Sequence, residues 1–215
     1  MTDGPPAIEW PIPADGVTES LVATLGPNDR WNLAALGLQA DGRGPTVDGD
    51  GTGSGGDGPE EVTARTWGRT RTRGNFERQG GGVVQFVDDP VVFVDTALGI
   101  VERDEPVHPA AAAHVRVGVE RLETGERDGT AWVDWLLRPR EAVVRRRVVP
   151  TVRRGFAAAV EATVHASRLD VPAYDDAELL SRLEFLESAV ETAGGERERR
   201  AFERIDDHTD WRERP

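Results

Sequence analysis

The spacing of apolar residues changes once along the chain, near Pro150, and this change constrains the fold more than any other feature. Before Pro150, short apolar segments of strand length alternate with turn residues. After it, apolar residues recur three or four positions apart, as on one face of a helix. The chain is therefore predicted to be mainly β, a barrel or sandwich of many short strands, with helices at its C-terminus.

The predicted strands follow from apolar runs and the turns that separate them. Gly26-Pro27-Asn28-Asp29 is a turn signal, so the segments on either side of it are predicted to form a hairpin. Asp88-Asp89-Pro90 is expected to separate two further strands. The predicted strands cover residues 17–25, 32–40, 62–71, 83–87, 91–94, 115–122 and 130–137.

Two C-terminal helices are predicted to pack as an antiparallel pair. The first covers residues 152–169, and the second begins at Asp175 or Asp176 and ends at Gly194. The charged tail, residues 196–215, is expected to be a frayed helix. This places a barrel domain at residues 1–148 and a helical extension at residues 149–208.

One segment, residues 41–58, consists almost entirely of Gly, Asp, Ser, Thr and Pro. It has too little apolar surface to order itself, and we expect a disordered insert between two strands.

Charge and cysteine content narrow the classes of function. The chain has 39 acidic and 26 basic residues, all the basic ones arginine, which argues against nucleic acid or an anionic membrane as partner and is typical of a halophilic protein. The absence of cysteine excludes disulfides, iron–sulfur clusters and thiol nucleophiles. No apolar run has membrane-spanning length and no signal peptide is recognisable, so a cytoplasmic location is expected.

A concentration of arginine follows the insert. Arg65, Trp67, Arg69, Arg71 and Arg73 occupy alternate positions, so an extended segment would place them on one face. Arginine forks match phosphate oxygens, and Thr72 could cap a short helix over residues 73–79 whose N-terminus would face an anion. The alternative is that these arginines pair with surface carboxylates, and charge alone does not decide between the two.

Other catalytic constellations are missing from the sequence. The histidines lack metal-ligand spacing, so no metal site is predicted. No serine lies in a nucleophile elbow, and no phosphate-binding glycine loop with a lysine is present. The four histidines are His108, His114, His165 and His208.

The order of these motifs resembles an uncharacterised, largely archaeal family of FMN-binding split-barrel proteins, itself similar to flavin reductase domains. The resemblance covers nearly the whole chain apart from the insert and the termini. It is carried by Glu19-Ser20-Leu21-Val22-Ala23-Thr24, Asn32-Leu33-Ala34-Ala35-Leu36-Gly37, Arg65-Thr66-Trp67, Thr70-Arg71-Thr72, Asn75-Phe76, Val83-Val84-Gln85-Phe86-Val87-Asp88-Asp89-Pro90, Ala131-Trp132-Val133, Arg154-Gly155-Phe156, Glu161-Ala162 and His165-Ala166-Ser167-Arg168-Leu169.

This resemblance implies a six-stranded split barrel that forms a homodimer, with FMN as cofactor in clefts at the subunit interface. The flavin ring would lie along the second strand, where backbone amides reach its carbonyl edge. Relatives tend to have Asn where this chain has Gln85. The implied cofactor-binding residues are Asn32, Leu33, Ala34, Ala35, Arg65, Trp67, Arg69, Thr70, Thr72, Asn75 and Gln85.

Three functions remain open at the level of sequence. The first is a flavin reductase-like oxidoreductase that takes electrons from a nicotinamide cofactor or another small-molecule donor, with the chemistry residing in the flavin. The second is a non-enzymatic FMN carrier or sensor. The third, a nucleic-acid module built on the arginines, is disfavoured by the net charge of −13.

Overall fold

A computed structural model describes residues 8–13, 15–41, 61–127, 129–149 and 151–214. The strands are β1 (Asp15–Leu25), β2 (Trp31–Asp41), β3 (Val62–Trp67), β4 (Gly81–Val87), β5 (Val101–Arg103), β6 (Ala111–Arg127) and β7 (Thr130–Val144). The helices are α1 (Arg71–Gln79), α2 (Pro90–Leu98), α3 (Arg154–Ala166), α4 (Asp176–Ala193) and α5 (Glu196–Thr209), followed by the 3-10 helix η1 (Trp211–Glu213).

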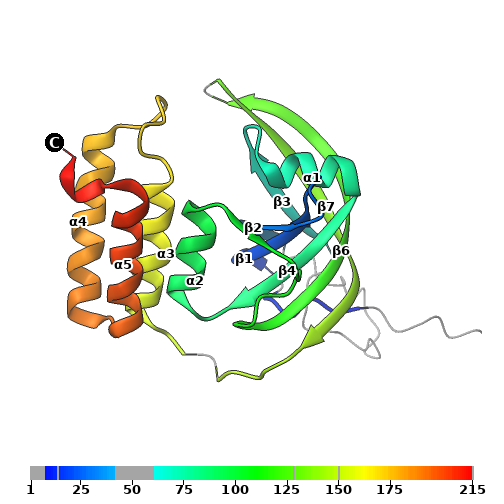
Figure 1. The fold of residues 1–215 in the computed structure, drawn as a ribbon, viewed down its shortest axis with the longest axis horizontal. Helices are drawn as coiled ribbons and strands as arrows, with labels where there is room; N and C mark the ends of the chain where they lie inside the picture. The colour runs from blue at the N-terminus through cyan, green and yellow to red at the C-terminus, as the bar shows by residue number, and fades with distance from the viewer. Residues whose placement is uncertain (1–7, 14, 42–60, 128, 150, 215) are drawn as a thin grey trace, which may run out of the picture.

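Six antiparallel strands close into a barrel in the order β1-β4-β6-β7-β3-β2, because β1 pairs with both β4 and β2. The short strand β5 adds to the outer edge of β2. Helices and barrel lie side by side, with α2 between the barrel and the other helices (Figure 1). The prediction of a mainly β chain with a split barrel and C-terminal helices is confirmed.

The barrel interior is filled by alternate residues of its strands. Val22, Leu38 and Val84 are among the residues that meet there. Helix α1 closes one end, because Phe76 enters the core and meets Trp135 edge-on with ring centroids 5.3 Å apart. These contacts fix α1, and therefore its first residues, against the end of the barrel.

The segment predicted as a strand at residues 91–94 is wrong, because it lies in helix α2. Asp89 caps this helix by accepting hydrogen bonds from the amides of Val91 and Val92, and Pro90 occupies its first turn. Val94 is fully buried against the C-terminal helices. Packing between helices has therefore overridden the β preference of a valine-rich run.

The predicted helix pair is confirmed as α3 and α4, with Asp175 as the N-cap of α4. The expectation of a frayed tail is wrong. Helix α5 packs on α2 and α3 through Phe202 and Ile205, and Trp211 of η1 is 4% exposed. The few apolar residues of α5 lie between charged residues in the sequence, but they form one apolar face that stabilises α5 as part of the helical layer.

The hairpin of β1 and β2 has the predicted turn, where the Gly26 amide donates to the Arg30 carbonyl at 2.7 Å. The predicted insert at residues 41–58 lies outside the described residues, apart from Asp41 at the end of β2. No helix in the described ranges is both long and apolar enough to cross a membrane.

Candidate functional site

The barrel is incompletely paired between β2 and β3. Residues 31–33 of β2 pair with β5 and residues 38–40 pair with β3, whereas residues 34–37 have β1 on one side and no strand on the other among the described residues. Continued in register, β3 would place Trp67 opposite Ala35. We call this gap between residues 34–37 and the end of β3 the split. At the split, the edge of β2 has backbone N–H and C=O groups that no strand of the described residues pairs with.

The N-terminus of α1 borders the split. Gly68, with φ of +66°, turns the chain out of β3, and Thr70 caps the helix by accepting from the Arg73 amide at 3.2 Å. The amides of Arg71 and Thr72 precede any acceptor within the helix, so they remain available to an anion. The predicted cap at Thr72 is therefore wrong by two residues, because the helix begins at Arg71 rather than Arg73.

An ion pair joins this helix start to the other side of the split. Arg71 Nη1 lies 2.7 Å from Glu102 Oε1, and Glu102 belongs to β5, which is paired with β2 opposite Asn32. Sequence reasoning missed Glu102, since an isolated glutamate in a three-residue strand carries no recognisable signal.

The arginine-rich segment does not form one face. Only Arg65 and Trp67 share the outer side of β3, because the strand ends at Trp67 and Arg71 and Arg73 lie in α1. Four of the five arginines between residues 65 and 78 are engaged. Their acceptors are Asp134 for Arg65, Glu102 for Arg71, Glu77 for Arg73 and the Leu25 carbonyl for Arg78.

Arg69 differs from those four arginines. It is exposed, directly precedes the cap residue Thr70, and has no ion pair or hydrogen bond with any described residue. Of the predicted phosphate ligands, Arg69 thus combines a free guanidinium with a position at the N-terminus of α1.

Arg65 has a different environment from the predicted one. Its guanidinium donates to Asp134 at 2.6 and 2.7 Å and lies over the Trp132 ring at 4.0 Å, with Trp67 at 5.5 Å. The hydrogen bonds to Asp134 raise the pKa of Arg65. For this residue, the alternative of pairing with a carboxylate is what the structure shows.

Thr72 and Asn75 face the barrel from α1, where both are buried. Asn75 Nδ2 donates to Thr24 Oγ1 at 2.9 Å, and its Oδ1 accepts from Arg78 at 2.6 Å. Asn75 therefore ties α1 to β1. The Thr72 hydroxyl makes no hydrogen bond with the described residues.

The predicted residues of β2 divide between its two faces. Ala34 packs against the barrel core, and Asn32 has the same orientation and is buried near Thr24. Leu33 points outward into a cluster with Ala23 and Val83. Ala34 and Ala35 lie in the split itself, so these two meet the condition for backbone contact with a ligand.

Gln85 is fully buried and both ends of its amide are used. Nε2 donates to the Pro106 carbonyl at 2.8 Å, and Oε1 accepts from the His108 amide at 2.6 Å. Gln85 lies two strands from Ala35, with Leu21 between them. The structure places Gln85 as a support for the chain segment around residues 106–108.

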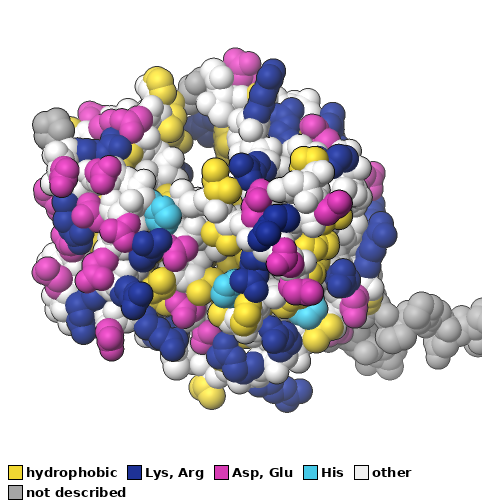
Figure 2. All heavy atoms as spheres, viewed as in Figure 1, with side chains coloured by type: hydrophobic (Ala, Val, Ile, Leu, Met, Phe, Trp, Pro, Cys, Tyr) yellow, Lys and Arg dark blue, Asp and Glu magenta, His cyan; other side chains and the backbone are white. Residues whose placement is uncertain are grey.

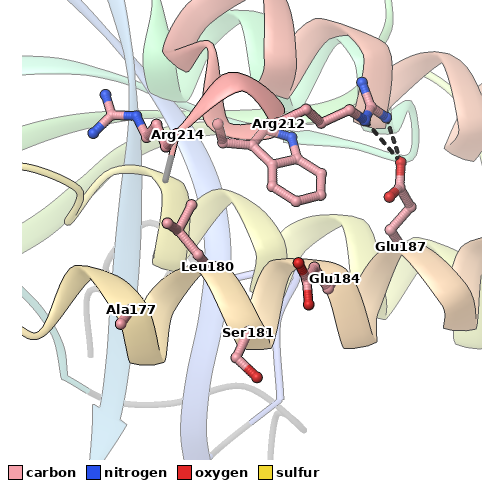
Figure 3. A pocket seen from close by; sticks show the side chains of 8 residues that line it. Ala177, Leu180, Ser181, Glu184, Glu187, Arg212 and Arg214 are labelled. Carbon is pink, nitrogen blue, oxygen red and sulfur yellow. Dashed lines mark hydrogen bonds and ion pairs between the residues drawn. The ribbon is translucent and has the colours of Figure 1, made fainter.

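The described residues contain no metal-binding group, and they form a further cavity that is separate from the split. Within the described ranges, no three His, Asp or Glu side chains are grouped to hold a metal ion. A cavity of about 370 Å³ between α4 and η1 is bordered by the ion pair of Arg212 with Glu187 (Figure 3). None of the predicted site residues lines it.

Comparison with known proteins places the chain in a family. A model of the N-terminal domain of a protein family of unknown function, DUF447, matches residues 18–146, and the model of its C-terminal part matches residues 153–207. No curated protein matches the chain.

Among solved structures, an FMN-bound DUF447 protein from Methanosarcina mazei is similar with a TM-score of 0.70 and 23% identity, over 90% of this chain and 95% of that one. Nitrilotriacetate monooxygenase component B from Bacillus cereus has a TM-score of 0.42 and 16% identity, over 66% and 75%. A flavoredoxin from Methanosarcina acetivorans has a TM-score of 0.41 and 13% identity, over 70% and 77%. Because the two family models together match most of the sequence, the chain belongs to the DUF447 family.

Proposed function

We propose that this protein binds FMN at the split of its barrel. One observation carries the proposal: Arg69, the free guanidinium of the arginine-rich segment, lies at the N-terminus of α1, beside the unpaired edge of β2. A phosphate and a flat ring with a polar edge are the two chemical features that such a site would recognise. The FMN-bound member of the same family supports this choice of ligand.

The residues present fit the two ends of FMN. Arg69 and the amides of Arg71 and Thr72 would bind the phosphate, and the hydroxyl of Thr70 keeps its proton for donation while its oxygen caps the helix. The backbone of residues 34–37 would meet the carbonyl edge of the flavin ring. Trp67, 43% exposed at the end of β3, is available to pack on the ring.

The remaining predicted residues act on this site indirectly. Asn75 holds α1 on β1 through Thr24, and the pair of Arg65 with Asp134 joins β3 to β7. Both contacts fix the backbone whose amides and side chains border the split. In this proposal, Asn75, Arg65 and Asp134 are positioning residues.

We propose further that the bound flavin serves as the reactive group of a flavin reductase-like oxidoreductase. FMN would supply hydride and electron transfer, while the chain binds and orients it and limits the access of water. No acid or base from the protein is required for that role. The alternative is an FMN carrier or sensor that uses the same site without turnover.

A spectrum and a turnover assay separate these possibilities. The purified protein, kept in molar salt because of its 39 acidic residues, should show the absorption bands of bound flavin. Consumption of NADH or NADPH with FMN as acceptor would identify a reductase. Flavin bands without turnover of either donor would favour the carrier or sensor, and a colourless protein that does not take up FMN would refute the proposal.

We also propose a homodimer as the functional unit. Phe93 and Trp135 are buried within one chain, so neither requires a partner subunit to cover it. Trp67 remains exposed beside the split, and a second subunit would cover it there. Light scattering combined with flavin fluorescence would test whether dissociation releases FMN.

A further inference from the structure

A second hollow lies on the outer face of the barrel, away from the split. It has a volume of about 410 Å³, which is in the range of small-molecule sites, and none of the residues bordering the split lines it. Trp31 and Val83 form part of its wall, and Arg116 and Arg140 supply its positive charge. Glu141 also lines the pocket, so its charged side chains, two arginines and one glutamate, carry a net charge of +1 in a chain whose net charge is −13.

A β-bulge places Arg140 at this pocket. On β6, Arg116 pairs with Glu141 and the next residue, Val117, pairs with Pro139, so Arg140 is the extra residue on β7. Bulges redirect a side chain that a regular ladder would place elsewhere. Arg140 makes no hydrogen bond or ion pair with any described residue, so its guanidinium has no internal acceptor.

Glycine provides the space that Arg140 occupies. A Cβ atom at Gly118 would lie 2.6 Å from Arg140 Nη2 and 2.8 Å from Nε, so any other residue there would displace the guanidinium. Gly118 is paired with Gly81 of β4, and a Cβ at Gly81 would lie 2.6 Å from the Val117 carbonyl oxygen. The Arg140 guanidinium therefore lies over Gly118, and Gly81 and Gly82 of β4 line the pocket beside it.

We propose that this pocket is a second ligand site, which binds a small planar ring carrying a carboxylate or phosphate. The Arg140 fork would bind the oxyanion, and the ring would lie beside Gly81 and Gly82, next to Trp31. Arg116 is held by Glu141 at 3.1 Å, and because both of these side chains line the pocket, its unbalanced positive charge is that of Arg140. The site is separate from that proposed for FMN, because its lining residues are all different.

Calorimetric titration of the protein, with and without saturating FMN, tests this site. The probes are benzoate for a carboxylate and AMP for a phosphate, each compared with its neutral counterpart, benzamide or adenosine. We expect at least one anion to bind tenfold or more tightly than its neutral counterpart, and the identity of that anion distinguishes the two sources. Equal binding of both members of each pair, or no binding of either anion, would overturn the proposal.

Three variants test the role of Arg140. Arg140→Met should weaken binding of the anion about tenfold to a hundredfold, the range for loss of a charged hydrogen bond. The matched control is Arg138→Met, because Arg138 lies two residues away on β7, pairs with Glu120 and does not line the pocket. Gly118→Ala should imitate Arg140→Met without removing the charge.

The same variants distinguish this site from the flavin site. Arg140→Met should keep the FMN affinity of the parent, so a loss of FMN in step with the anion would show that the pocket belongs to the flavin site. If Arg138→Met weakens the anion as much as Arg140→Met, the effect is one of general charge and the assigned site is wrong.

Discussion

Arg65 of β3 and Asp134 of β7 form a two-pronged ion pair, with donor–acceptor distances of 2.6 and 2.7 Å, on the outside of the barrel. Both oxygens of the Asp134 carboxylate accept a hydrogen bond from Arg65, and the Trp132 ring covers the guanidinium from one side. The pair therefore stabilises the junction of the two strands and occupies the Nε and Nη2 side of the Arg65 guanidinium, which is the fork a bidentate contact to a phosphate would use.

The variant Arg65→Ala should accordingly affect stability more than flavin affinity. We expect a loss of about 1 kcal/mol in the free energy of unfolding, the upper range for a partly exposed pair, with the FMN dissociation constant nearly unchanged. Urea unfolding and flavin titration of the same preparation measure both. A large loss of FMN affinity at unchanged stability would restore Arg65 as a ligand.

Gln85 should behave as a structural residue. Its replacement by alanine leaves the Pro106 carbonyl and the His108 amide without their partner in a buried region, at a cost of about 2–4 kcal/mol in unfolding free energy. Gln39→Ala is the control, since Gln39 is exposed on β2. Chemical denaturation decides the point, and a variant as stable as the control would contradict this role.

Buried histidines should make the fold sensitive to acid. Burial lowers the pKa of His165 below its ordinary value of 6.5, while Glu161 opposes this shift from 3.4 Å. As the pH falls below 6.5, the unfolded chain binds more protons than the folded one. The contribution of neutral His165 to the free energy of unfolding is therefore complete above pH 6.5 and is lost as the pH falls. Burial lowers the pKa values of His108 and His114 in the same direction.

Urea unfolding at pH 7.5 and pH 5.5 measures this acid sensitivity. The parent should be less stable at pH 5.5, and His165→Gln should lose less stability between the two values. Burial raises the pKa of Glu19, with Glu161 adding to the effect, so Glu19 alone would favour the folded state on acidification and act in the opposite direction. An equal loss in parent and variant would show that His165 is not responsible.

The barrel and the C-terminal helices were predictable because their signals are local. Alternation along strands and helical spacing after Pro150 can be read within ten or twenty residues. The failures have a different origin. Helix α2 consists of good strand formers and is helical because α3 and α5 pack against it. Helix α5 is ordered because Phe202 and Ile205 pack in the same core cluster as α2. Those partners lie far away in sequence.

The candidate site was predictable only in part for the same reason. Arg69 and Thr70 were named from the concentration of arginine and from the family resemblance, but the helix cap was predicted at Thr72, so their position directly before α1 follows from the structure. The pairing of Arg65 depends on Asp134, 69 residues away, and the burial of Gln85 depends on the segment around His108. The split itself is a gap in strand register, which no single segment of sequence encodes.

The dissociation constants of FMN and riboflavin, measured for the parent, Arg69→Ala and Arg200→Ala, test the central claim most directly. Arg200 is an exposed arginine of α5 without a partner among the described residues, so it matches Arg69 in charge and exposure but not in place. Arg69→Ala should weaken FMN by about tenfold to a hundredfold and leave riboflavin unchanged, because only FMN carries the phosphate. The parent should prefer FMN, and Arg200→Ala should equal the parent. Equal affinity of the parent for the two flavins, or an Arg69→Ala variant that binds FMN like the parent, would contradict the account.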